Sequence, residues 1–122
     1  MNSSFDVTVV VPAYQAADWL WATLSSVEEQ TLLPSALVVV DDGSTDETCS
    51  VVERFQAASL IPSVRLLRRS HGGPGAARNA GVHAADTPWI AFLDSDDLWH
   101  PDKLRRVYQA VLEHPKANFF CH

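Results

Sequence analysis

Aspartate is concentrated in two short segments of the chain. Six of the ten aspartates lie within residues 41–46 and 94–97. Each segment directly follows an apolar run, at residues 36–40 and 89–93. Crowded carboxylates repel one another unless a cation or hydrogen-bond donors offset the repulsion. Mg²⁺ or Mn²⁺ prefers oxygen ligands and can bridge to substrate phosphates, so the two segments predict a metal-assisted site.

Each acidic segment also has a purely structural interpretation. The DDGS sequence at residues 41–44 is typical of a turn that leads into a helix, and the DSDD sequence at 94–97 of a solvated loop. Both follow predicted parallel strands, however, and ligands of open α/β sheets bind at the carboxyl ends of the strands. Two acidic segments at this one edge favour a binding site.

A third segment of chemical interest is the glycine-rich stretch HGGPGAARNAG at residues 71–81. It is not a dinucleotide fingerprint, because Arg78 stands where a small residue is needed, and it is not a P-loop, because no Gly-Lys-Ser/Thr follows. A tight loop, a helix N-terminus and a cation can hold a phosphate or a base. In the alternative interpretation Arg78 pairs with a surface acid. His71 and His100 are interpreted as loop histidines, and Tyr14 either stacks on a base or covers the sheet edge.

Apolar runs predict the strands that must position these segments. They lie at residues 7–11, 36–40, 64–68, 89–93 and 118–121. Because they lack polar alternation, they predict strands that are covered on both faces, as in parallel sheets.

Helical patterns lie between the strands. Leu20, Leu24 and Val27 are spaced to share one helix face, and the STDE sequence at 44–47 matches a capping box for a second helix. An Ala-rich helix is predicted at residues 75–83, and a last helix is predicted to start at Pro101. Strands alternating with helices predict an α/β fold, a three-layer α/β/α sandwich with a mostly parallel sheet and right-handed crossovers.

Length and composition narrow the class of protein. A chain of 122 residues suits one domain or one piece of a larger protein, and its net charge of −6 argues against nucleic acid as a partner. Cys49 and Cys121 form no CxxC pair, so neither a zinc site nor a disulfide scaffold is indicated. We see neither a signal peptide nor a membrane-spanning run, and we expect a cytoplasmic domain.

Four motifs in register carry a resemblance to a known family. They are VVVPAY at 9–14, VDDGSTD at 40–46, GAARNAG at 75–81 and FLDSDDLW at 92–99, and Gln30-Thr31 fits as well. Over residues 7–122 the chain resembles the N-terminal, nucleotide-binding portion of the family-2 glycosyltransferases. The resemblance implies a Rossmann-like GT-A nucleotide-diphospho-sugar transferase fold, truncated to a single domain over residues 1–122 that lacks the acceptor-binding half.

The resemblance also implies an activity. It is the transfer of a sugar from a nucleoside diphosphate sugar, with a UDP-sugar favoured, to a saccharide, lipid or protein acceptor. Transfer would invert the anomeric carbon, use Mn²⁺ or Mg²⁺, and serve cell-wall or polysaccharide biosynthesis. The roles of individual residues follow from their positions in the motifs. Pro12, Ala13 and Tyr14 would frame the base, Asp41 would accept a hydrogen bond from it, and Arg78 would close that pocket. Asp94 would approach the ribose, and Asp96 would bind the metal.

Two departures from the family pattern bear on function. Gln15 stands where the family more often has asparagine, which changes the length of an amide side chain. The chain ends after the predicted fifth strand, so we assign no general base, and the isolated chain is expected to be poorly active. We expect a later segment or a second copy of the chain to cover the apolar strand at 118–121, and later segments to carry any membrane association of a full-length protein.

Other functions remain open at the level of sequence. One is a non-catalytic nucleotide-sugar-binding fragment. Another is a metal-dependent aspartate phosphotransferase with Asp94 or Asp96 as nucleophile, although that class places its acidic pair after the first strand. A receiver-type signalling domain would need a lysine at a late strand end, and neither Lys103 nor Lys116 is so placed.

Overall fold

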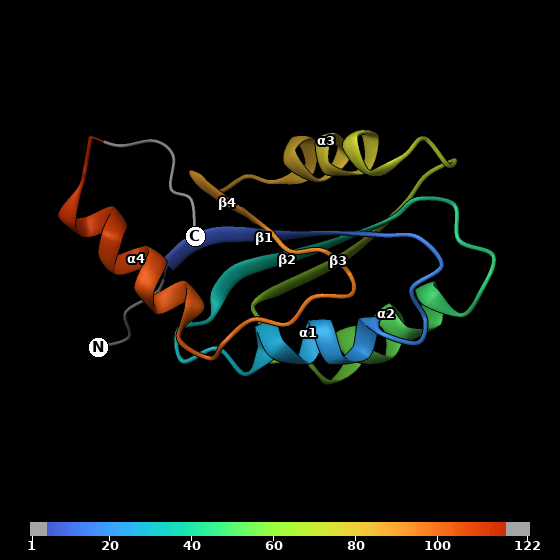
Figure 1. Ribbon diagram of the computed structural model, residues 1–122, viewed down its shortest axis with the longest axis horizontal. Helices are drawn as coiled ribbons and strands as arrows, with labels where there is room; N and C mark the ends of the chain where they lie inside the picture. The colour runs from blue at the N-terminus through green and yellow to red at the C-terminus, as the bar shows by residue number, and fades with distance from the viewer. Residues whose placement is uncertain (1–4, 117–122) are drawn as a thin grey trace.

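The computed structural model describes residues 5–116 as an alternation of strands and helices (Figure 1). The elements are β1 (Phe5–Ala13), α1 (Leu20–Glu28), β2 (Pro34–Asp41), α2 (Thr48–Ala58), β3 (Ser63–Arg68), α3 (Pro74–Ala84), β4 (Trp89–Phe92) and α4 (Lys103–Glu113). The predicted α/β class and four of the five predicted strands are confirmed. The fifth, at 118–121, lies outside the described residues, as does the oligomer contact expected there.

The described strands form one parallel sheet in the order β3-β2-β1-β4. β1 is central, and its Val9 is in register with Leu37 of β2 and with Ala91 of β4. From β1 the chain runs outward to β2 and β3 on one side, and then returns across the sheet to β4 on the other. The strand order therefore reverses at β1.

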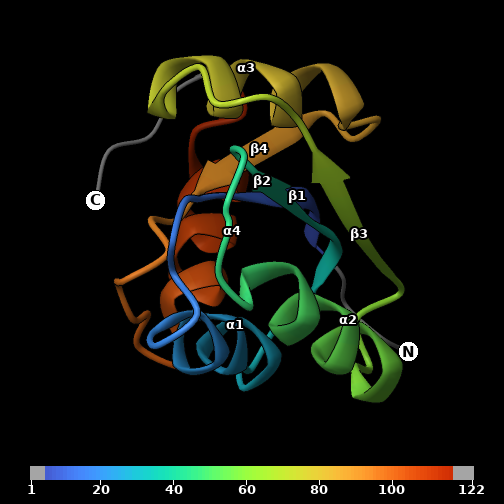
Figure 2. The same ribbon diagram turned by 90° about the vertical axis from the view of Figure 1, so that its right-hand side faces the viewer.

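Helices cover both faces of this sheet. α3 lies on one face, and α1, α2 and α4 lie on the other (Figures 1 and 2). The side chains of β1 divide accordingly: Val9 packs in a core with Leu24 and Val52, whereas Val10 packs in a separate core with Ala77 of α3. Burial on both sides explains why the strand sequences are apolar without alternation.

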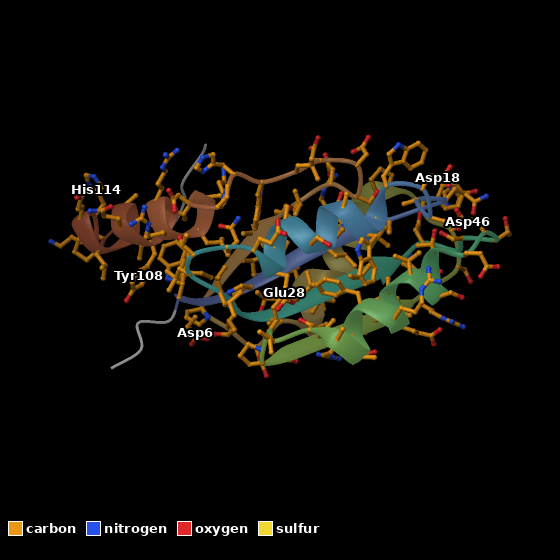
Figure 3. All side chains as sticks on the ribbon, turned by 90° about the horizontal axis from the view of Figure 1, so that it is seen from below. Asp6, Asp18, Glu28, Asp46, Tyr108 and His114 are labelled. Atoms are coloured by element: carbon orange, nitrogen blue, oxygen red, sulfur yellow. The ribbon has the colours of Figure 1, made fainter. Side chains whose placement is uncertain are left out.

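The last helix packs across the amino end of β1. The buried Leu104 anchors it, and the ring centroid of Tyr108 lies 5.1 Å from that of Phe5. Figure 3 labels Tyr108 on this helix. α4 begins at Lys103, slightly later than the predicted start at Pro101. Within the described part of the chain, none of the helices has the length and apolar character to cross a membrane.

The predicted capping box at residues 44–47 is wrong. α2 begins only at Thr48, and the side chain of its N-cap residue, Glu47, makes no capping hydrogen bond. The Ser44 hydroxyl instead accepts a hydrogen bond from the backbone N–H of Gln15, at 2.8 Å. A contact with a distant loop has therefore taken the hydroxyl that the local pattern assigned to the helix.

Close packing between α3 and β1 gives a direct test of this architecture. A Cβ at Gly81 would lie 2.3 Å from Cγ1 of Val10, whereas a Cβ at Gly75, in the same helix, would meet nothing within 4 Å. Gly81→Ala should therefore lower the free energy of unfolding by about 1–3 kcal/mol, because the helix must move away from the sheet. Urea denaturation followed by circular dichroism measures the change.

Gly75→Ala is the matched control. It should leave stability unchanged or raise it by up to about 1 kcal/mol, since alanine is the better helix former. Equal stabilities for the two variants would contradict the tight approach of α3 to β1.

Candidate functional site

A cavity of about 420 Å³ opens at the carboxyl ends of the strands. Its walls come from the loop after β1, from Asp42 after β2, from the glycine-rich loop (residues 69–73) with the first turns of α3, and from the acidic loop (residues 93–102) after β4. The cavity therefore lies where the strand order reverses between β1 and β4. Loops on either side of such a switch point diverge and leave a crevice, which is where open α/β sheets bind ligands.

The structure brings most of the predicted site residues together. Six of the seven line this cavity: Pro12, Ala13, Tyr14, Arg78, Asp94 and Asp96. Asp41 does not line it. The buried Asp41 carboxylate accepts hydrogen bonds from the backbone N–H of Ser44, at 3.3 Å, and from the Cys49 thiol, at 3.2 Å. Burial and the Asp41 carboxylate both raise the pKa of the Cys49 thiol, which keeps it protonated as a donor.

Asp42 lines the cavity and anchors the glycine-rich loop. Its side chain is buried, and its carboxylate accepts hydrogen bonds from the backbone N–H groups of Gly72 and Gly73, at 3.0 and 2.9 Å. His71 Nδ1 lies 2.9 Å and Arg69 Nε 3.4 Å from the carboxylate oxygens. Burial by itself would raise the pKa of Asp42, but the two backbone donors and the neighbouring His71 and Arg69 hold it below its usual value of 3.8.

Glycine is required where these two loops meet. Gly43 has a φ of +84°, and a Cβ there would lie 2.8 Å from the backbone nitrogen of His71. Gly73, which donates to Asp42, has a φ of +96°. Both angles lie in the region that residues with a Cβ rarely adopt. The glycines therefore let the backbone of the loop close onto Asp42.

His71 lies in the loop between β3 and α3, as interpreted from the sequence, and it also forms part of the cavity wall. Its ring lies between Asp42 and Tyr14, with its centroid 4.3 Å from that of Tyr14 and a tilt of 33°. The Tyr14 side chain is 49% exposed, so one part of its ring remains open to the cavity. The position of His71 directly before the Gly72-Gly73 pair was the available signal in the sequence.

Gln15 fastens the loop after β1 to the loop after β2. Its side-chain oxygen accepts the backbone N–H of Thr45 at 2.7 Å, and its side-chain nitrogen donates to the Thr45 hydroxyl at 3.1 Å. Gln15 has a φ of +52°, a conformation in which asparagine is more common. The longer amide thus has a visible use, since it spans the gap between the two loops.

Asp46 supports the same junction. Its carboxylate accepts the backbone N–H of Ala17 at 3.2 Å and that of Thr48 at 3.1 Å. Burial opposes ionisation, but the Thr48 hydroxyl and these N–H groups together lower the pKa of Asp46. Figure 3 shows Asp46 and Asp18 toward this end of the molecule, with His114 at the opposite end.

An ion pair joins α3 to the acidic loop. Arg78 donates to Oδ1 of Asp94 at 3.0 Å, and the two side chains are 39% and 52% exposed. The predicted alternative, in which Arg78 pairs with an acid, is therefore true in part, but its partner is itself a cavity residue. Exposure of both groups means that a ligand can compete for either of them.

Three buried polar residues on α1 and just after it had no structural role assigned from the sequence, although Gln30 was part of the family pattern. Thr23, Ser26 and Gln30 are buried and bond to the backbone of the acidic loop and of the segment that follows it. They lie at helical spacing on the face that also carries Leu24 and Val27. Polar residues interleaved on a buried helical face were the signal that could have identified them.

The acidic loop has a donor set that fits a divalent cation only in part. Asp94 and Asp96 present exposed carboxylates to the cavity. Within residues 5–116, however, no three His, Cys, Asp or Glu side chains converge as a preformed metal site. Mg²⁺-type ions are commonly held by one or two carboxylates, with water and substrate phosphates completing the shell. The residues present fit that mode of binding.

A parallel sheet with its cavity at the switch point defines a Rossmann-like α/β domain. Its sequence matches the family described as "Glycosyl transferase family 2" over residues 8–122. The chain belongs to this family. The match favours a glycosyltransferase over the aspartate phosphotransferase and receiver alternatives.

Individual relatives agree with this assignment. The succinoglycan biosynthesis protein ExoO of Rhizobium meliloti is 47% identical over 105 residues, which cover 85% of this chain and 29% of that protein. The structure of S. aureus TarS 1-349 in complex with UDP matches with a TM-score of 0.81 at 28% identity, over 91% of this chain and 33% of that 1-349 chain.

A second solved structure extends the comparison. The mannosyltransferase PcManGT from Pyrobaculum calidifontis, in complex with GDP-Man and Mn²⁺, matches with a TM-score of 0.81 at 29% identity, over 89% of this chain and 33% of that protein. These likenesses confirm the GT-A fold. The chain spans about a third of the length of each of these three matched chains.

The buried carboxylate of Asp42 predicts a specific loss of stability on substitution. Asp42→Asn removes a charge that four donors surround and points an N–H₂ group at other donors. The free energy of unfolding at neutral pH should therefore fall by about 3 kcal/mol. Because the folded pKa of Asp42 is lowered, its contribution is present above the unfolded value near 3.8 and is lost as the pH falls through the folded pKa.

Urea denaturation at a series of pH values measures this effect. The stability difference between wild type and Asp42→Asn should shrink as the pH falls below 3.8. Asp86→Asn, which removes an exposed carboxylate just before β4, should match wild type throughout. A difference that stays constant with pH would contradict the buried, ionised state of Asp42.

Proposed function

We propose that this chain is the donor-binding part of an inverting, metal-dependent glycosyltransferase. The donor is a nucleoside diphosphate sugar, with a UDP-sugar favoured, and the cation is Mn²⁺ or Mg²⁺. The observation that carries the proposal is the cavity at the switch point, which unites the aromatic and glycine-rich loops with the acidic loop in a chain of family 2. The UDP bound in TarS and the GDP-Man and Mn²⁺ bound in PcManGT support it.

One end of the cavity suits the nucleoside. Pro12, Ala13 and Tyr14 offer a flat, partly apolar wall on which a base can stack. Asp41 is the proposed acceptor for an N–H of the base. Asp42 is a second candidate because it lines the cavity, although four donors already surround its carboxylate.

The other end suits the ribose and the diphosphate. We assign Asp94 to the ribose and Asp96 to the metal. Arg78 lies beside Asp94 and would close the base pocket. When bound, a divalent cation would neutralise negative charge on the diphosphate leaving group.

Acceptor chemistry is proposed only in outline. We assign no general base, and the acceptor is a saccharide, a lipid or a protein. The name of the relative ExoO, a succinoglycan biosynthesis protein, favours polysaccharide biosynthesis. A non-catalytic nucleotide-sugar-binding module is the second candidate, because the chain spans about a third of its relatives.

Calorimetric titration of UDP into the chain, first with Mn²⁺ and then with EDTA, tests the proposed donor site. UDP should bind more tightly with Mn²⁺ than with EDTA. In Asp96→Asn the UDP affinity measured with Mn²⁺ should fall tenfold or more, to about the affinity measured in EDTA. GDP and ADP serve as comparators for the preference of the base pocket.

Asp86→Asn is the matched control, since it removes one exposed carboxylate away from the cavity. It should bind UDP as wild type does. Equal UDP affinity with Mn²⁺ and with EDTA, or an Asp96→Asn variant that keeps the full gain, would refute the proposed metal site.

A further inference from the structure

The backbone of the acidic loop is held by hydrogen bonds with side chains of α1 and of Gln30, which lies just after that helix. Gln30 bonds through its side-chain amide to the carbonyl of His100 and to the N–H of Leu104, at 2.7 and 2.9 Å. Ser26 accepts the N–H of Trp99 at 3.2 Å. These contacts fix the far part of the loop and the start of α4, several residues beyond the carboxylates that face the cavity.

Thr23 makes the contact nearest to the carboxylates. Its side chain is fully buried, and its hydroxyl donates to the carbonyl of Ser95 at 2.8 Å. A helical threonine hydroxyl usually bonds to a carbonyl in the preceding turn of its own helix. Here it points outward to the one residue that separates Asp94 from Asp96.

The direction of this network is determined by its partners. A carbonyl can only accept, so the Thr23 hydroxyl must donate to Ser95. The Ser26 hydroxyl donates to the carbonyl of Thr23 at 2.7 Å and accepts the N–H of Trp99. The Thr23 hydroxyl is thus committed to the loop as a donor, and the Ser26 hydroxyl bonds to the loop as an acceptor.

The two cavity carboxylates are held in different ways. The Asp94 side chain is paired with Arg78. Among the described residues, by contrast, no hydrogen bond or ion pair holds the carboxylate of Asp96. Its position therefore depends on the backbone that precedes it, and the Ser95 carbonyl is the part of that backbone which a buried side chain holds.

We infer that Thr23 is a positioning residue for the divalent cation, because its hydroxyl fixes the Ser95 peptide and so directs the carboxylate of Asp96. The inference rests on the function proposed above. Groups that orient a metal ligand typically alter metal affinity by 10- to 100-fold when removed. The nucleoside end of the cavity is anchored separately by Asp42, so loss of Thr23 should weaken only the part of donor binding that depends on the metal.

The test compares UDP affinity in Mn²⁺ with UDP affinity in EDTA, by calorimetric titration of the whole chain. In Thr23→Val, which keeps the shape but not the hydroxyl, the ratio of the two affinities should fall about tenfold. Affinity in EDTA should not change. Thr23→Ser restores a hydroxyl and should keep the wild-type ratio.

Thr8→Val is the matched control. Thr8 is also fully buried, and its hydroxyl lies 2.8 Å from that of Thr87, but it is in β1 opposite Ile90, away from the acidic loop. Both valine variants should lower the thermal unfolding midpoint, and only Thr23→Val should lower the affinity ratio. If Thr23→Val does not fold, Thr23→Ala, which also lacks the hydroxyl, takes its place.

The outcomes separate the inference from the function on which it rests. If Mn²⁺ raises the UDP affinity of the wild type and of Thr23→Val by the same factor, the role of Thr23 is overturned and the proposed function stands. An equal fall of the ratio in Thr8→Val would also overturn it, since general loosening would then be the cause. A wild-type chain without any Mn²⁺ gain would overturn the proposed metal site and the inference together.

Discussion

The position of β1 is the constraint on which the rest of this structure depends. The strand has a parallel partner at each edge and a helical layer on each face, and nearly all of its side chains are buried. Parallel partners on both sides require the chain to leave β1 in one direction and to return on the other side. That reversal parts the loops at the carboxyl edge and opens the cavity.

Two kinds of anchor then hold the loops around the cavity. The glycine-rich loop closes onto the buried, ionised Asp42, whose charge is offset by backbone N–H groups, His71 and Arg69. The acidic loop is held by neutral side chains of the α1 region, among them Thr23 and Gln30. The buried charge of Asp42 thus holds one loop, and the exposed charge of Asp96 lies on the other. The Asp96 carboxylate stays exposed, because neutral groups hold the backbone that carries it.

Much of the fold could be predicted from the sequence because its signals are local. An apolar run without alternation, such as residues 36–40, is enough to indicate a strand buried on both faces, and the alternation of such runs with helices indicates a parallel α/β sheet. The motifs after the strands located six of the seven predicted site residues at one cavity. The rule that strand ends share an edge needs no knowledge of side-chain contacts.

The tertiary structure decided which polar group meets which. The motif assigned the base contact to Asp41, yet Asp41 bonds to Ser44 and Cys49, whereas Asp42 faces the cavity and holds the loop that contains His71. The Ser44 hydroxyl, assigned by its local pattern to a helix cap, bonds to Gln15 instead. Apolar burial follows from periodicity along one segment, whereas a hydrogen bond depends on two groups from distant segments meeting in one geometry. The sequence by itself therefore determined the layers and the edge at which the site lies, and only the folded chain determined the contacts that position its residues.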